Sequence, residues 1–117
     1  MARGRQETGE PYHRISVQEA FEMQQEGAMF IDVRRPDEWV TGHVSGAVHI
    51  PVDDLLGAAD AQLPKDKDLL FICAAGVRSG LAAEMVSALG YESDHLYNVE
   101  EGTPVWIQAD LPTDTGE

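Results

Sequence analysis

The sequence contains a single cysteine, Cys73, in a setting that suits a nucleophile. Four apolar residues, Leu69–Ile72, lead into it, and a short run of small residues follows it as far as Arg78. An uninterrupted apolar run of this length is typical of a strand that is buried on both faces of a parallel sheet. Open α/β sheets bind their ligands at the carboxyl ends of such strands, so the sequence predicts a reactive thiol at that edge.

A free cysteine thiol has a pKa near 8.5 and is only slightly ionised at neutral pH, so a useful nucleophile needs a lower pKa. A helix is predicted to begin at Ser79, and its N-terminus would favour an anion at Cys73 by about 0.3–1 kcal/mol. Such a contribution lowers the thiol pKa by roughly one unit at most, since one unit corresponds to about 1.36 kcal/mol. The rest must come from backbone N–H groups of the loop, which can form an anion nest. The loop residues are Ala74, Ala75, Gly76 and Val77.

Charged side chains near the loop are the next candidates. Arg78 has two interpretations: it assists the anion at Cys73, or it forms a buried ion pair with Asp32, at the end of the neighbouring apolar run 28–33. Arg34 and Glu38 are expected to pair with each other at the rim of the site. His13, His49 and His95 show no metal-ligand spacing, His43 is expected to make a structural hydrogen bond, and a lone cysteine does not suggest a zinc site, so no metal is predicted.

Strands that alternate with helices are expected to position these residues. Ser16 and Glu19 form a capping-box pattern that opens a helix ending near Gly27. Pro36, followed by acidic residues, predicts a short helix. The alternation predicts an α/β layer fold with a mainly parallel sheet. Strands are expected near 12–15, 28–33, 48–50, 69–72 and 96–99, and further helices near 53–56, over 79–89 and around Trp106.

Length and composition indicate one globular domain. The 117 residues are predicted to divide into a loose segment 1–11, a folded domain 12–112 and a tail 113–117. The formal net charge of −13 argues against nucleic acid and against anionic membranes as partners. No apolar run approaches the roughly 20 residues of a membrane span. One cysteine cannot form an internal disulfide, which makes the cytoplasm the expected location.

The loop motif, taken together with the rest of the chain, resembles a known family. Residues 73–79 resemble the Cys-x-x-Gly-x-Arg-Ser active-site loop of single-domain rhodaneses. The resemblance extends over roughly residues 12–112, in the order and spacing of that family. It is also carried by Ile31-Asp32-Val33-Arg34, Pro36-x-Glu38-Trp39, Gly42-His43-Val44-x-Gly46-Ala47, Ile50-Pro51, Leu89-Gly90-Tyr91, Asn98-Val99, and Gly102 with Trp106.

This resemblance implies a five-stranded, mainly parallel sheet with helices on both faces, and a reaction that transfers sulfur. Cys73 would attack the sulfane sulfur of a donor such as thiosulfate or a persulfide, and would carry that sulfur as a persulfide. A thiophilic acceptor, such as cyanide or a thiol, would then remove it. The loop would bind the persulfide, Ser79, Asp32, Arg34 and Glu38 would support it, and no cofactor would be required.

Three alternatives bear on that expectation. Related folds that act on phosphate or arsenate esters have a loop one residue longer, and the six residues from Cys73 to Arg78 favour sulfur. A non-catalytic binding module usually lacks the cysteine, whereas a redox sensor would use the same exposed thiolate.

Ala74 and Ala75 stand where some rhodaneses have basic or polar residues. In so acidic a domain, we therefore expect thiosulfate to be a poorer donor than a neutral or protein-bound persulfide. The oligomeric state, monomer or homodimer, stays open.

Overall fold

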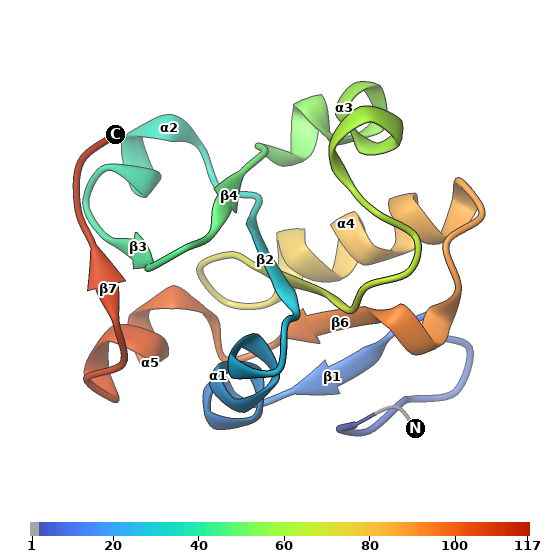
Figure 1. The fold of residues 1–117 in the computed structure, drawn as a ribbon, viewed down its shortest axis with the longest axis horizontal. Coiled ribbons are helices and arrows are strands. Elements are labelled where there is room, and N and C mark those ends of the chain that lie inside the picture. Colours follow the sequence, from blue (N-terminus) through green and yellow to red (C-terminus); the bar gives the residue numbers. More distant parts are fainter. Residues whose placement is uncertain (1–2) are drawn as a thin grey trace.

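Five parallel strands form the central sheet of the computed structural model, which describes residues 3–117 (Figure 1). The strand order is β1-β6-β5-β2-β4, so β5 lies in the middle, as its apolar sequence predicts. Parallel pairing sets Leu69 at the start of β5 against Met29 of β2 and Leu96 of β6. The strands are β1 (His13–Ile15), β2 (Met29–Asp32), β4 (Val48–His49), β5 (Leu69–Ile72) and β6 (Leu96–Val99).

Helices cover both faces of the sheet, which confirms the predicted architecture (Figure 1). Because side chains alternate along a strand, Leu69 and Phe71 of β5 join the core under α3 and α4. Leu70 and Ile72 join the core under α1 and α5. The apolar run therefore needs no polar position. The helices are α1 (Val17–Gln25), α2 (Pro36–Trp39), α3 (Leu55–Gln62), α4 (Val77–Ala88) and α5 (Gly102–Gln108), with short 3-10 turns η1 (Val52–Asp54) and η2 (Ser93–His95).

The predicted helix signals are present at α1 and α2. The Ser16 hydroxyl accepts a hydrogen bond from the Glu19 backbone N–H, and the Glu19 carboxylate accepts one from the Ser16 N–H. This completes the capping box, and the helix ends just before Gly27. Pro36 occupies the first turn of α2. These local patterns fix both ends of α1 and the start of α2, as the sequence predicts.

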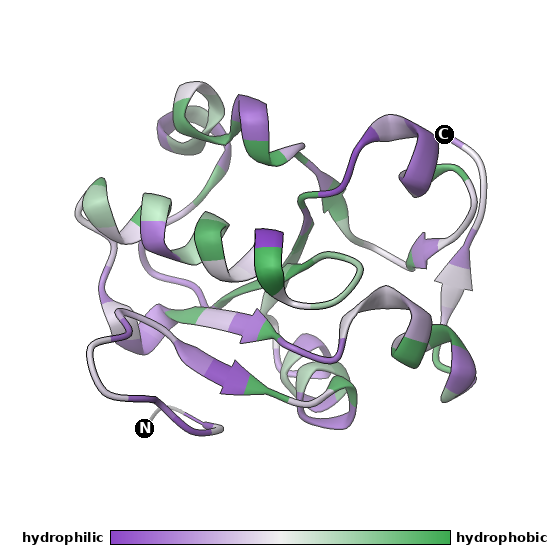
Figure 2. Ribbon diagram, turned by 180° about the vertical axis from the view of Figure 1, so that it is seen from behind, coloured by the Kyte–Doolittle hydropathy of each residue, from purple (hydrophilic) through white to green (hydrophobic). Residues whose placement is uncertain are grey.

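The helix after the cysteine begins earlier than predicted, at Val77 rather than Ser79. Gly76 precedes it in the left-handed conformation, with φ of 89°. A Cβ at this position would lie 2.6 Å from the Glu100 carbonyl oxygen, so both the backbone and the close packing require glycine. As a result, Arg78 and Ser79 lie inside the first turn of α4. In Figure 2, hydrophobic and hydrophilic residues alternate around α4, whose buried residues face the sheet.

The ends of the chain also contact the domain. Arg5, in the segment expected to be loose, pairs with Arg14 as an antiparallel β-bridge and binds the Glu100 carboxylate. Residues 1 and 2 lie outside the described residues. In the predicted tail, β7 (Thr113–Asp114) pairs antiparallel with β3 (His43–Val44), which forms a second, two-stranded sheet. Neither strand is predicted: each has only two residues, and polar side chains occupy one position of β3 and both positions of β7.

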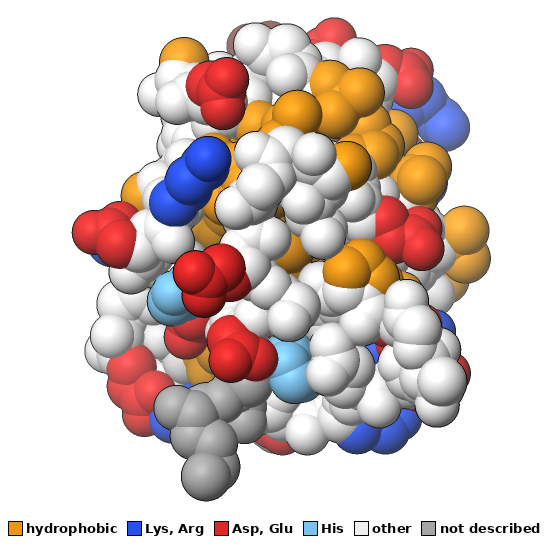
Figure 3. All heavy atoms as spheres, turned by 90° about the vertical axis from the view of Figure 1, so that its right-hand side faces the viewer, with side chains coloured by type: hydrophobic (Ala, Val, Ile, Leu, Met, Phe, Trp, Pro, Cys, Tyr) orange, Lys and Arg blue, Asp and Glu red, His pale blue; other side chains and the backbone are white. Residues whose placement is uncertain are grey.

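The surface is predominantly acidic. Acidic side chains are spread over the face shown in Figure 3, and hydrophobic side chains gather in its upper part, on the side of α3. The net charge of −13 therefore surrounds the domain with a negative potential. None of the described helices combines the length and the apolar character needed to cross a bilayer.

Candidate active site

Cys73 directly follows β5 at the carboxyl edge of the sheet, and only 1% of its surface is exposed. Its backbone carbonyl accepts two hydrogen bonds from Thr103 in the first turn of α5, from the backbone N–H at 2.8 Å and from the hydroxyl at 3.2 Å. Gly102, with φ of 82°, lets this turn approach closely, because a Cβ there would overlap the Ala74 carbonyl. The base of the loop is therefore held by α5 as well as by β5.

The sulfur of Cys73 faces hydrogen-bond donors inside the loop. The Gly76 backbone N–H donates to Sγ at 3.1 Å, and the Ser79 Oγ lies 3.2 Å from Sγ. The structure thus brings together Cys73, Gly76 and Ser79 of the predicted site. Ala75 and Val77 lie on the outside of the loop, where Val77 is 80% exposed, and Ala74 is partly buried. The inner surface of the loop is polar, whereas its outer surface carries only small or apolar side chains.

Two opposing influences act on the pKa of the Cys73 thiol. Burial is the largest single influence, and it raises the pKa because it disfavours the thiolate. Hydrogen bonds from the Ser79 hydroxyl, and from the backbone N–H groups of Ser79, Ala75 and Gly76, lower it. Together these hydrogen bonds outweigh burial, so the thiol pKa lies below its ordinary value. The loop can therefore hold an anionic sulfur away from water.

Arg78 pairs with Glu38, and not with Asp32 as one interpretation of the sequence expects. Its two terminal nitrogens donate to the two carboxylate oxygens at 2.6 and 2.9 Å, which ties α4 to α2. The hydrogen bonds from Arg78 are the main cause that lowers the pKa of Glu38 to about 2. The predicted pair between Arg34 and Glu38 is likewise wrong. The short helix α2 turns Glu38 towards α4, which removes it from the reach of Arg34.

Asp32 binds Arg34 in a buried pair at the end of β2. The Arg34 side chain donates to the Asp32 carboxylate through Nε at 3.0 Å and Nη2 at 2.8 Å, and its backbone N–H donates to the same carboxylate at 3.0 Å. Nη2 also donates to the Gly42 carbonyl at 2.7 Å. The two residues are almost adjacent in the chain, so the turn after β2 brings their side chains together. This pair fixes the chain beside the loop.

Two functional candidates are missing from the sequence-based prediction of site residues. Asn98, in β6, accepts a hydrogen bond from the Ser79 hydroxyl at 2.6 Å and donates one to the Gly76 carbonyl at 3.1 Å. Thr103 holds the Cys73 carbonyl. The sequence offers one signal for Asn98: it is an amide inside an otherwise largely apolar strand, and such a buried group requires partners. Thr103 offers no comparable signal.

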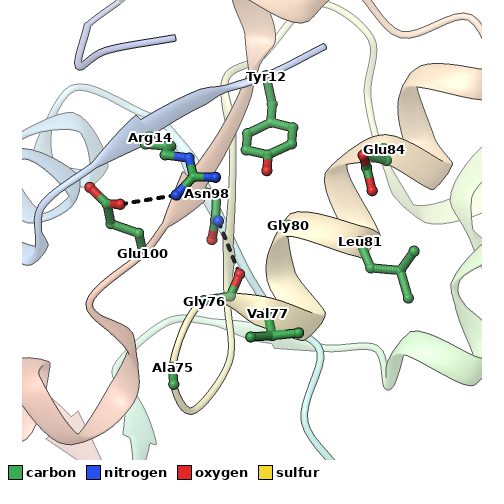
Figure 4. A pocket seen from close by; sticks show the side chains of 10 residues that line it. All are labelled: Tyr12, Arg14, Ala75, Gly76, Val77, Gly80, Leu81, Glu84, Asn98 and Glu100. Carbon is green, nitrogen blue, oxygen red and sulfur yellow. Dashed lines mark hydrogen bonds and ion pairs between the residues drawn. The ribbon is translucent and has the colours of Figure 1, made fainter. Parts of the chain in front are cut away.

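A surface hollow of about 530 Å³ lies beside the loop, over β1, β6 and α4 (Figure 4). Gly76 and Asn98 belong to its wall, and Leu81 of α4 adds an apolar side chain. Arg14 also lines it, but its guanidinium is bound to Glu10 and lies 3.5 Å from the Glu100 carboxylate. Cys73 does not line this hollow. The hollow therefore adjoins the outer side of the loop and not the sulfur.

Two of the four histidines, His43 and His49, hold the segment around α2. His43 Nδ1 lies 2.8 Å from the Trp39 carbonyl oxygen, and His49 Nε2 lies 2.7 Å from that of Arg34. Trp39 stacks on both imidazole rings. Within residues 3–117, no group of three or more His, Cys, Asp or Glu side chains is arranged to hold a metal ion.

Comparison with known proteins places this geometry in a family. The model of the rhodanese-like domain matches residues 16–109. The thiosulfate sulfurtransferase GlpE of Ectopseudomonas mendocina is 30% identical over 109 residues, which cover 91% of this chain and 94% of that protein. The GlpE of Haemophilus influenzae is 30% identical over 105 residues, which cover 90% and 97% respectively.

Solved structures agree with the sequence relatives. A rhodanese-related protein from Thermoplasma volcanium is 31% identical, with a TM-score of 0.78 and coverage of 88% of this chain and 98% of that chain. An E. coli rhodanese with anions is 32% identical, with a TM-score of 0.65 and coverage of 77% and 100%. The chain therefore belongs to the rhodanese-like domain family.

Proposed function

We propose that this protein is a sulfurtransferase that carries a sulfane sulfur on Cys73. One observation carries the proposal: the only sulfur nucleophile of the chain is buried at the end of the central strand, where the Gly76 backbone N–H donates to its sulfur and the Ser79 hydroxyl lies 3.2 Å from it. Relatives named thiosulfate sulfurtransferase, about 30% identical to this chain, support the same class of reaction. The acceptor in this proposal is a thiophile, either cyanide or a thiol.

The reaction proceeds as two displacements at sulfur. In the first, the Cys73 thiolate attacks the outer sulfur of a donor persulfide. A bond forms between Sγ and that sulfur, the S–S bond of the donor breaks, and the donor leaves as a thiolate. In the second, the acceptor attacks the outer sulfur of the Cys73 persulfide, and Cys73 leaves as a thiolate. No net oxidant is consumed, because the sulfane sulfur moves from one sulfur atom to the next acceptor.

The backbone donors of the loop suit both steps. Negative charge resides on Sγ before the first step and returns to it in the second, and fixed N–H groups stabilise such charge without reorganising. The Gly76 N–H is fixed in this sense, since the glycine is confined between Cys73 and Glu100. Charge on the outer sulfur of the persulfide would lie inside the same loop.

We further propose that a neutral or protein-bound persulfide is a better donor than thiosulfate. Ala74 and Ala75 offer no positive charge on the outside of the loop. Arg78 is already bound through both terminal nitrogens to Glu38. The net charge of −13 also repels a dianion at long range. Thiosulfate would therefore meet little electrostatic attraction at this site.

The loop length supports sulfur over phosphate chemistry. The loop holds six residues from Cys73 to Arg78, one fewer than in the related folds that act on phosphate or arsenate esters. A redox-sensing role would use the same thiolate, but it would not require the loop to accept an outer sulfur. The sulfurtransferase proposal is therefore the one that uses the whole loop.

The proposal is tested by steady-state rates with thiosulfate, glutathione persulfide and a smaller persulfide, each with cyanide or a thiol as acceptor. We expect turnover with the persulfides, a high KM for thiosulfate, and no turnover by Cys73→Ser. A low KM for thiosulfate that is insensitive to added salt would contradict the donor preference. Hydrolysis of an aryl phosphate without sulfur transfer from any donor would contradict the function itself.

A further inference from the structure

The Ser79 hydroxyl lies between two groups that compete for its single hydrogen. Its oxygen is 2.6 Å from Asn98 Oδ1 and 3.2 Å from Cys73 Sγ. All three residues are buried, so water does not readily replace either partner. A hydroxyl has one hydrogen to donate. It can therefore serve the amide oxygen or the sulfur, but not both at once.

The orientation of the Asn98 amide is set by its other end. Its Nδ2 donates to the Gly76 carbonyl oxygen at 3.1 Å, and the same oxygen accepts the Gly80 backbone N–H at 3.1 Å. Rotating the amide by 180° would place Oδ1 against that carbonyl oxygen, with no hydrogen between them. Oδ1 must therefore face Ser79, where it acts only as an acceptor.

We propose that Asn98 is a positioning residue for Cys73, because it holds the Ser79 hydroxyl hydrogen while the sulfur is neutral and releases it when the sulfur is charged. In the neutral state, the Cys73 S–H donates to Ser79 Oγ, and the Ser79 O–H donates to Asn98 Oδ1. In the charged state, Ser79 rotates its hydrogen towards Sγ, and Oδ1 loses its donor. Asn98 thus limits how strongly Ser79 stabilises the thiolate.

Charged groups around the sulfur are already engaged with one another. Arg78, on α4, is bound to Glu38 of α2, and Asp32 of β2 is bound to Arg34. Glu100, after β6, binds Arg5 and lies 3.5 Å from Arg14. Among the described residues, neither Ser79 nor Asn98 hydrogen-bonds a charged side chain. The position of one hydroxyl hydrogen is therefore the variable that Asn98 controls.

A double-mutant cycle on the thiol separates this role from simple support of the loop. Cys73 is the only cysteine, so the pH dependence of alkylation by iodoacetamide reports its pKa alone. Asn98→Leu removes the competing acceptor. It should therefore lower the Cys73 pKa by about one unit more when the Ser79 hydroxyl is present than in the Ser79→Ala background. At a pH below the pKa, this difference corresponds to about a tenfold difference in alkylation rate. Asn98→Ala serves as a second variant if the leucine disturbs folding.

Thr103→Val is the matched control, because the Thr103 hydroxyl supports the loop by donating to the Cys73 carbonyl and not to Ser79. Its effect on the Cys73 pKa should be equal with and without the Ser79 hydroxyl. If the Asn98 variants also change the pKa equally in both backgrounds, Asn98 only supports the loop and the inference is overturned.

The role of Asn98 rests on the proposed function only where it would affect the rate of sulfur transfer. The alkylation measurement needs no sulfur donor, so the role of Asn98 and the sulfurtransferase function can fail separately. An additive cycle with normal persulfide formation would reject the role of Asn98 alone. A coupled cycle without sulfur uptake would reject the proposed function alone.

Discussion

Two arginine–carboxylate pairs lie beside the Cys73 loop, and they differ in burial and in the segments that they join. Asp32 and Arg34 are almost adjacent in the chain, with side chains that are 0% and 6% exposed. Glu38 and Arg78 join α2 to α4, with side chains that are 22% and 29% exposed. The buried pair fixes the end of β2, whereas the partly exposed pair holds the charge nearest the loop.

This difference in burial indicates whether a substitution in each pair should change mainly the stability of the fold or also the charge at the site. Removing one partner of a buried pair leaves a charge that water cannot solvate, which destabilises the fold strongly. A partly exposed pair contributes less to stability, because solvent screens it. Substitutions at Asp32 should therefore cost more stability than substitutions at Glu38, and only the latter should also change the charge available to a substrate at the site.

The largest expected effect is on stability. Asp32→Asn leaves Arg34 buried without its carboxylate and should lower the free energy of unfolding by about 3–5 kcal/mol. Denaturant-induced unfolding measures this loss. The control is Asp37→Asn, in a pair with Arg35 whose side chains are 71% and 68% exposed, and it should cost at most about 1 kcal/mol. Equal losses for the two variants would remove the distinction between the pairs.

A smaller effect, dependent on pH, is expected at Glu38. Its pKa is about 2 in the folded protein, below the ordinary value of 4.5, so its ion pair stabilises the fold above about pH 4.5. That contribution is lost as the pH falls towards 2. The difference in unfolding free energy between wild type and Glu38→Gln should be about 1–3 kcal/mol near neutral pH and should vanish as the pH falls below about 2. A difference that does not change with pH would show that Glu38 acts through packing rather than charge.

The smallest effect concerns the choice of donor. Glu38→Gln releases the Arg78 guanidinium from its carboxylate, so it should lower the KM for thiosulfate several-fold. The decrease should be less than tenfold, which corresponds to a free-energy change of less than about 1.4 kcal/mol. The KM for a neutral persulfide should change little. Steady-state kinetics with both donors measure the ratio, and Asp37→Asn should leave it unchanged. If both KM values fall together, the guanidinium does not discriminate between the donors.

Local patterns in the sequence predict much of the fold. The apolar run before Cys73 specifies a central strand because each of its side chains must be buried, and the capping box at Ser16 specifies a helix start. The early start of α4 at Val77 is not predicted, because it depends on the left-handed backbone of Gly76. That conformation is stabilised by packing against Glu100, which is distant in the sequence.

Contacts between distant segments account for what the sequence does not predict at the site. The sequence suggests Asp32 as the partner of Arg78, whereas the direction of α2 brings Glu38 to Arg78 instead. Asn98 and Thr103 reach the loop from β6 and α5, through hydrogen bonds that leave no periodic pattern in the sequence. Residue types and spacing therefore point to the proposed nucleophile and its loop, while the fold determines the groups that surround them.

The most direct test of the central claim is the intact mass of the protein after brief exposure to thiosulfate or to a persulfide. We predict that the wild type gains one sulfur atom, more completely from the persulfide, and that Cys73→Ser gains none. Subsequent cyanide should remove the added sulfur. Failure of the wild type to gain sulfur from any donor, or an equal gain by the variant, would contradict the assignment of Cys73 as the sulfur carrier.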